Sequence, residues 1–293
     1  MLKRIEIFLI AAIFILITAV ILIIYTKQRE QEFQTHKTLI QETTVNGAAY
    51  AINLQLQEKQ RHVRLFANEY SRLFIHLNSF PSDEKTANDI KVRLEQRFPD
   101  FFTYTISSNE GVPKLMDIES LVGHACQIDI KNFAINVSKD KHTYQNKVFI
   151  HPQPFNYHYD IMAPLYNNGG SSHVFFISFY LTEIVDILKT HEIPGQSLIL
   201  VRQSDPKLIE VTSKGARDKI KREIRLSDIE KTTVSKNIPG TDWRLLNLAD
   251  PTYEEKYLKG LWNEVMIILS IVSFTLLIVI LLLIKLSENR RKY

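Results

Sequence analysis

The pattern of apolar and polar positions divides the chain into two uninterrupted apolar runs and a long mixed region between them. The runs, residues 7–25 and 265–284, contain no charged residue. At a rise of about 1.5 Å per residue, each would form a helix roughly 30 Å long, which matches the hydrocarbon thickness of a membrane. The first run is too long for a signal peptide, and no A-x-A-like cleavage site follows Tyr25. The pattern therefore predicts transmembrane helices over residues 7–25 and 262–284.

Basic residues beside the two runs indicate their orientation. Six of them lie near the chain termini: Lys3, Arg4, Lys285, Arg290, Arg291 and Lys292. Such residues concentrate on the cytoplasmic side of membrane helices, although the other flanks of the two runs are basic as well. We expect residues 1–6 and 285–293 in the cytoplasm and a large region between the spans on the other side of the membrane.

The net charge of +4 comes from these termini. Without the six basic residues and the acidic Glu6 and Glu288, the rest of the chain holds 30 basic and 30 acidic residues. A basic face for a polyanion is therefore not expected, and we predict no nucleic-acid partner. Cys126 is the single cysteine, which excludes an internal disulfide and a zinc site built from cysteine pairs. The region between the spans must rest on its own apolar core.

A long helix is predicted directly after the first span. Between residues 28 and 77 there is no proline, and Gly47 is the only glycine. Apolar residues recur there at alternating steps of four and three, with Lys59 as the one interruption. The stripe comprises Val45, Ala49, Ile52, Leu56, Lys59, Val63, Phe66, Tyr70, Leu73 and Leu77. It packs against its own domain, or pairs with the same helix of a second copy in a homodimer. Both can hold on different stretches, with the membrane-proximal part as the dimer contact.

The remaining pattern is typical of sheets with helices. Residues 82–84 resemble a cap for a second helix over 90–98, and alternating β-branched and aromatic residues then predict strands. The expected strands are 101–107, 147–151, 157–166, 172–181, 196–203, 208–213 and 241–250, and the expected helices are 121–135, 182–191, 217–229 and 251–262. This order indicates an α+β fold, a central sheet with helices to one side. We divide it into helices over 26–98, a larger unit over 99–192 and a smaller unit over 193–261.

The densest group of ionisable and aromatic residues lies around the third expected strand. It comprises His151, Tyr157, His158, Tyr159 and Asp160, beside two prolines that stiffen the preceding loop. Because side chains alternate along a strand, His158 and Asp160 would share one face, and Tyr157 and Tyr159 the other.

Three interpretations of this group stay open. In the first, which is purely structural, the rings pack the sheet while the His–Asp pair caps a loop. In the second, the group lines a site for a small polar or anionic ligand, with Tyr104 also beside it. A metal bound by His151, His158, His124 and Asp160 is the third, but the spacing matches no firm template. Our functional prediction is the ligand site, with no metal and no cofactor.

Motifs of common enzymes are missing from the sequence. It contains no G-x-x-x-x-G-K-[ST], no G-x-S-x-G, no H-E-x-x-H and no kinase signature set. The members of a Ser-His-Asp triad need not be adjacent in the sequence, so a hydrolase is a minor alternative. We expect that this chain is not an enzyme.

Four segments carry a resemblance to a known family: "DIESLVGHAC", "VFIHPQPFNYHYDIMAPL", "LILVRQSDPKLIEVTSKGARD" and "IPGTDWRLLNLADP". They resemble the extracytoplasmic part of membrane-bound GGDEF diguanylate cyclases, and the order of elements resembles Cache-type sensor regions. The resemblance implies a protein of the bacterial inner membrane. Its periplasmic region would consist of PAS-like sensor units, preceded by a long helix and flanked by two spans, that serve cyclic di-GMP signalling. The chain departs from that family where a cyclase would follow, because it has no G-G-[DE]-[DE]-F motif.

The sequence thus predicts a membrane-bound sensory region that binds a small ligand and signals to a cytoplasmic effector. That effector would be either a further domain of a longer transducer or a separate protein. The alternative is an accessory or assembly protein that binds a partner protein and has no ligand pocket. A buried, polar-lined site beside His158 would favour the sensor, and a solid core with an exposed apolar patch would favour the alternative.

Overall fold

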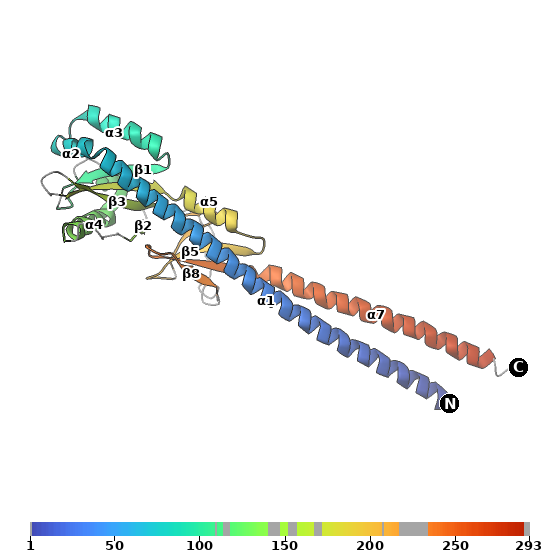
Figure 1. Ribbon diagram of the computed structural model, residues 1–293. Helices are drawn as coiled ribbons and strands as arrows, with labels where there is room; N and C mark the ends of the chain where they lie inside the picture. Colours follow the sequence, from blue (N-terminus) through green and yellow to red (C-terminus); the bar gives the residue numbers. More distant parts are fainter. Residues whose placement is uncertain are drawn as a thin grey trace. The chain divides into compact units, whose positions relative to one another are not determined.

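The computed structural model describes residues 2–108, 110–113, 118–139, 147–151, 157–166, 172–206, 208–216 and 234–289. The chain forms two compact units, which we name by their content. The helical unit consists of Met1–Ile40 with Ala249–Tyr293, and the sheet unit consists of Gln41–Leu248. Figure 1 labels the helices and strands of both.

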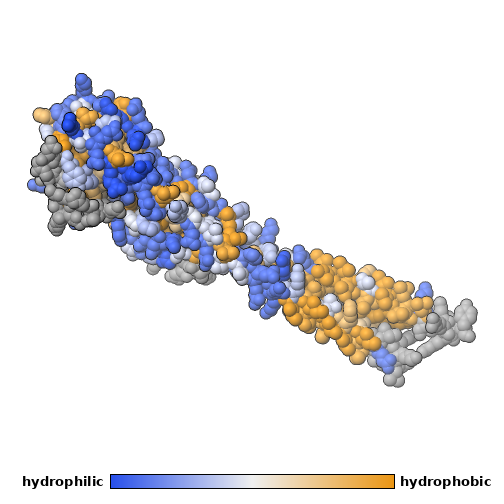
Figure 2. Space-filling model, viewed as in Figure 1, coloured by the Kyte–Doolittle hydropathy of each residue, from blue (hydrophilic) through white to orange (hydrophobic). Residues whose placement is uncertain are grey.

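The helical unit contains the two predicted spans. Helix α1 (Leu2–Glu69) begins here and continues into the sheet unit, and helix α7 (Pro251–Asn289) lies wholly here. Both are long and apolar enough to cross a membrane, and their most apolar stretches are almost wholly unburied. Figure 2 shows hydrophobic residues, in orange, gathered on these helices. A helix from a soluble core would bury such a surface, so the pattern agrees with two membrane spans.

Polar and aromatic contacts join α1 to α7 at one end of their apolar stretches. The rings of Phe33 and Tyr257 stack with centroids 4.1 Å apart. Lys37 Nζ donates to Glu254 Oε2 over 2.6 Å, and Gln34 donates to the other carboxylate oxygen of Glu254. These hydrogen bonds, from Lys37 first and Gln34 second, lower the pKa of Glu254. These five side chains are named the juxtamembrane clasp below.

The first sheet of the sheet unit is wholly antiparallel. It has the order β1 (Phe101–Ser107), β4 (Ser172–Tyr180), β3 (His158–Tyr166) and β2 (Ile150–His151). Helix α2 (Ser71–Ser79) and the end of α1 pack on one face, where Phe74 and Phe66 contact Phe175. Helix α4 (Ile118–Lys139) packs on the other face. The α+β class is confirmed, but helices cover both faces of this sheet, so the expectation of helices to one side was wrong.

The helix boundaries differ from the predicted ones at two places. The long helix ends at Glu69, and α2 restarts at Ser71 after Tyr70. Helix α3 spans Glu84–Arg97, whereas the apolar pattern predicted residues 90–98. The cause is Asp83, whose carboxylate accepts a hydrogen bond from the backbone N–H of Thr86 and so starts the helix before its apolar period begins.

The apolar stripe of α1 packs inside its own subunit. Val45, Ile52, Leu56 and Val63 are buried in the same cluster as the strands of the first sheet. Packing of these positions against their own domain is therefore confirmed, and pairing with a second copy on another stretch of the helix stays a prediction. Lys59, which interrupts the stripe, is buried as well.

The second sheet has five strands in the order β7 (Gly215–Ala216), β6 (Ile209–Thr212), β5 (Gln196–Arg202), β9 (Trp243–Ala249) and β8 (Ser235–Asn237). Helix α5 (Thr182–His191) contacts β5, β6 and β7. The strands β7 and β8 were not predicted, because two or three residues are too short to show a period. The expected helix over 217–229 lies outside the described residues.

A shared core joins the two sheets. Tyr159 of β3 stacks on Phe179 with ring centroids 5.5 Å apart and meets Trp243 of β9 edge-on at 6.1 Å. All three side chains are fully buried in one apolar cluster. The division of this region into units over 99–192 and 193–261 stays a prediction.

Candidate functional site

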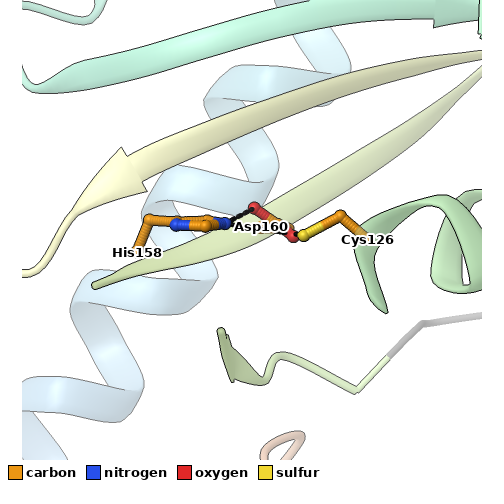
Figure 3. Close-up of side chains that lie close together, drawn as sticks. All are labelled: Cys126, His158 and Asp160. Carbon is orange, nitrogen blue, oxygen red and sulfur yellow. Dashed lines mark hydrogen bonds and ion pairs between the residues drawn. The ribbon is translucent and has the colours of Figure 1, made fainter. Parts of the chain in front are cut away.

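The alternation of β3 places the predicted residues on two faces, as the sequence indicated. His158 and Asp160 point toward α4, and Figure 3 shows both beside Cys126 of that helix. Tyr159 points the opposite way, into the shared core. Antiparallel pairing sets His151 of β2 directly opposite His158.

Six polar side chains meet between α4 and the first sheet, and we name them the α4-face cluster. They are Cys126 and Asp129 of α4, His151 of β2, His158 and Asp160 of β3, and Ser178 of β4. His158 Nε2 lies 3.5 Å from Cys126 Sγ and 3.7 Å from Asp160 Oδ1. His151 Nε2 lies 3.2 Å from Asp129 Oδ2 and 3.5 Å from Asp160 Oδ2. Ser178 Oγ donates to Asp160 Oδ1 over 2.6 Å.

The cluster is almost closed to solvent. Cys126, His158 and Ser178 are 0% exposed, Asp160 is 5% exposed and His151 is 8% exposed. Apolar residues surround it, with Ile130 and Phe176 packed around Cys126. Charges in such a setting are costly unless they are paired. The cluster therefore gathers several ionisable side chains in a place that is nearly closed to water.

Burial and neighbouring carboxylates shift the pKa values of the cluster. Burial alone would lower the pKa of His151, but the carboxylates of Asp129 and Asp160 outweigh it and raise that pKa above the usual value. Burial, supported by the charge of Asp160, raises the pKa of the Cys126 thiol far above its usual range. In the cluster as it stands, Cys126 is a protonated thiol and not a reactive thiolate.

Two buried polar atoms of the cluster lack a hydrogen bond of normal geometry within the described residues. They are His151 Nε2 and Asp160 Oδ2. The two atoms lie within ion-pair distance of each other, but the direction of approach does not suit a hydrogen bond. Buried polar atoms are nearly always satisfied, so an unsatisfied pair in one cluster indicates a missing partner.

The predicted tyrosines are not part of the cluster. Tyr104 lies on the other face of the sheet, where its hydroxyl donates to the carbonyl of Ala87 over 3.2 Å and burial raises its pKa to about 12. Tyr157 and Tyr159 pack against the apolar core. The structure thus brings together His151, His158 and Asp160 and separates them from the three tyrosines. Ligand binding by each of the six residues stays a prediction.

The cluster also contains three residues that the sequence interpretation missed. Asp129 lies three positions after Cys126 on α4, so both can face one neighbour. Ser178 pairs directly with Asp160 across β3 and β4. The helical spacing was visible in the sequence, but the docking of α4 against this strand was not.

Two surface hollows lie away from the cluster. One is lined by Lys27, Glu30, Gln31, Gln34 and Thr35, and the other by Ser235, Lys236, Asn237 and Arg244. Neither includes a residue of the cluster. A ligand at the cluster would have to be small, or α4 would have to move.

Comparison with known proteins gives structural likenesses alone. No family model matches the chain, and no curated protein matches it. The ligand-binding domain of the Campylobacter jejuni chemoreceptor Tlp3, solved with L-valine, is similar at 12% identity and a TM-score of 0.49, over 77% of this chain and 96% of that one. The periplasmic domain of Vibrio cholerae LuxQ is similar at 12% identity and a TM-score of 0.45, over 71% of this chain and 98% of that one.

A third similar structure is an extracellular ligand binding receptor from Desulfohalobium retbaense. Its identity to this chain is 12% and its TM-score is 0.44, and the match covers 70% of this chain and 39% of that one. The chain therefore spans well under half of that receptor. The association of this chain with a cyclase is a proposal.

Proposed function

We propose that this chain is the sensory region of an inner-membrane receptor that binds a small polar or anionic molecule outside the cytoplasm. The observation that carries the proposal is the α4-face cluster, in which His151, His158 and Asp160 are buried in a unit that is attached to two candidate membrane spans. Apolar residues of similar volume would hold α4 on the sheet at least as well. Buried ionisable groups with perturbed pKa values concentrate at functional sites.

Binding would act on the membrane through two states of the sheet unit. A ligand that fits one packing of α4 better than another shifts the population toward it, in proportion to its differential affinity. Helix α1 belongs to both units without a break, and α7 follows β9 after Asp250. These two connections are the covalent routes by which a change at the site would reach the spans.

The output in this proposal is cytoplasmic. Both termini would lie inside, as the basic residues indicate, and the ends of the spans would act on an effector in the same polypeptide or in a partner. A diguanylate cyclase is the effector that the sequence resemblance favours. The chain itself would have no catalytic turnover, since it has no G-G-[DE]-[DE]-F motif to bind GTP.

Pairing of two copies would use the outer face of α1. Its stripe residues face their own core, but Tyr50, Leu54 and Leu65 are exposed large side chains on the same helix. We expect Leu54→Cys to form a disulfide between subunits in oxidised membranes, whereas Ile52→Cys, which is buried, should not. Lys91→Cys on the exposed side of α3 is the control. Equal yields at Leu54 and Lys91 would contradict pairing through α1.

The site is tested by a thermal-shift screen of the full chain in detergent. The library should contain amino acids, organic acids and other small polar or anionic metabolites. A ligand that binds the folded state alone stabilises it by about 2.7 kcal/mol at a hundredfold excess over its Kd. We expect Asp160→Asn and His158→Gln to abolish the shift. His173→Gln, at the other end of the same sheet, is the matched control.

Two results would contradict the proposal. If every ligand found in the screen raises the melting temperature of the two cluster variants as much as that of the wild type, the ligand binds elsewhere. If no hit is found and a partner protein binds the sheet unit instead, the accessory or assembly alternative is correct.

A further inference from the structure

The spacing of three buried donor atoms in the α4-face cluster is that of metal ligands. Cys126, His158 and Asp160 each offer one donor atom, and the three atoms lie within 4.8 Å of one another. With metal–sulfur bonds of about 2.3 Å and metal–nitrogen or metal–oxygen bonds of about 2.1 Å, tetrahedral ligands are separated by roughly 3.4 to 3.6 Å. The observed separations are 3.5 Å between Cys126 Sγ and His158 Nε2, and 3.7 Å between His158 Nε2 and Asp160 Oδ1.

The unsatisfied atoms of the cluster point to the same conclusion. Asp160 Oδ2 and His151 Nε2 are buried without a hydrogen bond of normal geometry within the described residues, and they lie 3.5 Å apart. That is also the separation of two ligands on one ion. An ion between these groups would give both atoms a partner and would neutralise a buried carboxylate.

A second layer of contacts holds the donors in place. Ser178 Oγ donates to Asp160 Oδ1 over 2.6 Å, which fixes the orientation of that carboxylate. Asp129 Oδ2 lies 3.2 Å from His151 Nε2, the atom that would face the ion, so it is a further nearby donor and not an outer contact. Metal ligands in proteins are regularly held by outer hydrogen bonds such as that of Ser178.

We propose that Cys126, His158 and Asp160 bind a divalent transition metal of the zinc class, with His151 as the candidate fourth ligand. The donor set of one sulfur, one or two imidazoles and one carboxylate suits Zn²⁺, Co²⁺ or Ni²⁺ and disfavours Mg²⁺ and Ca²⁺, which prefer oxygen ligands alone. On binding, the Cys126 thiol releases its proton to solvent and the sulfur bonds to the metal. The ion would tie α4 to β3.

This inference deepens the proposed function. The ion would be the sensed ligand itself, or would bind the sensed anion at an open coordination position. Its role in sensing rests on the proposed function, whereas metal binding can be measured without any signal. The sequence interpretation predicted no metal because the spacing of the histidines and Asp160 matches no firm template. The fold supplies the missing ligand, Cys126, from α4.

The test is a metal titration of the full chain in detergent after treatment with a chelator. We expect one Zn²⁺ per chain in competition with a chromophoric chelator, and a thiolate-to-cobalt charge-transfer absorption when Co²⁺ is used as the probe. Cys126→Ser should remove that absorption and weaken Zn²⁺ binding more than a hundredfold. Ser178→Ala should weaken it about 10- to 100-fold, as is usual for an outer-layer residue. His173→Gln should leave both signals unchanged.

A variant that loses metal because it fails to fold is recognised by its circular dichroism without metal. X-ray absorption of the zinc-loaded wild type needs no variant, and we expect a sulfur neighbour at about 2.3 Å. Absence of stoichiometric zinc, or a metal shell without sulfur, would overturn the proposal. If zinc does not bind, the thermal-shift screen with organic ligands still tests the proposed function. If that screen finds no ligand, the metal titration still tests this inference.

Discussion

Lys59 shows at the level of one residue how this fold accommodates buried charge. It occupies an apolar position of the α1 stripe, yet its ammonium group lies 2.8 Å from both carboxylate oxygens of Asp100 and 3.0 Å from Glu183 Oε2. It also lies 4.8 Å from the centre of the Phe179 ring. Two carboxylates and an aromatic face together replace the water that the ammonium group loses on burial.

Replacing this lysine should therefore destabilise the protein strongly. Lys59→Ala leaves the carboxylate of Asp100, whose side chain is 15% exposed, without its cation. We expect a loss of about 3 kcal/mol, the lower end of the range for a broken buried pair, because Glu183 can still reach water. The measurement is denaturant unfolding of the full chain in detergent, followed by tryptophan fluorescence.

A surface lysine supplies the comparison. Lys91 is paired with Glu95 at 3.9 Å on the exposed side of α3, so Lys91→Ala should change stability by no more than about 0.5 kcal/mol. If the two variants unfold at the same denaturant concentration, the burial of Lys59 does not hold in solution.

Single residues also mark the limit of what the sequence could predict. The period of two along β3 was enough to place His158 and Asp160 on one face and Tyr159 on the other. Tyr104 was assigned to the same site because it is aromatic, but its strand position turns it to the opposite face. The sequence analysis used Cys126 only to exclude a disulfide and a cysteine-pair zinc site. Its contact with His158 depends on tertiary packing that no local pattern encodes.

At the scale of elements, the start of α3 depends on one carboxylate. Asp83 accepts hydrogen bonds from the hydroxyl and the backbone N–H of Thr86, and His76 lies 3.0 Å away. These contacts, in that order, lower its pKa to about 2. The apolar period of the helix begins only at Ile90, which is why the sequence prediction began the helix too late.

The depressed pKa of Asp83 gives a testable dependence on pH. A carboxylate with a lower pKa in the folded state contributes stability that is complete above its unfolded value, near 3.8. That contribution disappears as the pH falls toward 2. We expect Asp83→Ala to lower the thermal midpoint of the full chain at pH 6 and to have progressively less effect below pH 4. Asp89→Ala, on the same helix but away from its start, is the control, and an equal loss at every pH in both variants would contradict the cap.

Longer elements were more predictable than short ones for a physical reason. Helices such as α5 and strands such as β1 contain enough residues to show their period, and both match the predicted bounds. The pairing of β2 with β3 and of β7 with β6 involves only two residues each. Such pairs are stabilised by their neighbours, and Val148 beside β2 forms an isolated bridge to Thr241, which lies between β8 and β9.

At the scale of the whole molecule, the apolar spans were the most certain prediction, because a long uncharged run has few alternatives to a membrane helix. The contacts between those helices could not be predicted. Glu254 meets Lys37 and Gln34 across more than two hundred positions of sequence, and Phe33 meets Tyr257 in the same clasp. The clasp joins α1 to α7, the two helices that would carry the signal in the proposed function.

The clasp can be tested by chemical cross-linking within one chain. We expect Phe33→Cys combined with Tyr257→Cys to react with a short bis-maleimide in membrane vesicles, because the native rings are stacked at 4.1 Å. Native Cys126 can stay in place, since its side chain is 0% exposed and its thiol is held protonated by burial, which raises its pKa. Mass spectrometry should find one linker added per chain, with both ends attached.

The matched control pairs Phe33→Cys with Lys259→Cys. Lys259 is only two positions after Tyr257 on α7 but points elsewhere, with its side chain 72% exposed and paired to Glu255. Two positions along a helix turn a side chain by roughly 200°, so this pair should gain two linkers, each attached at one end. If both pairs cross-link equally, α1 and α7 have no fixed facing sides. A cross-linked clasp that also blocks the response to a stabilising ligand would show that the two helices move relative to each other when the receptor signals.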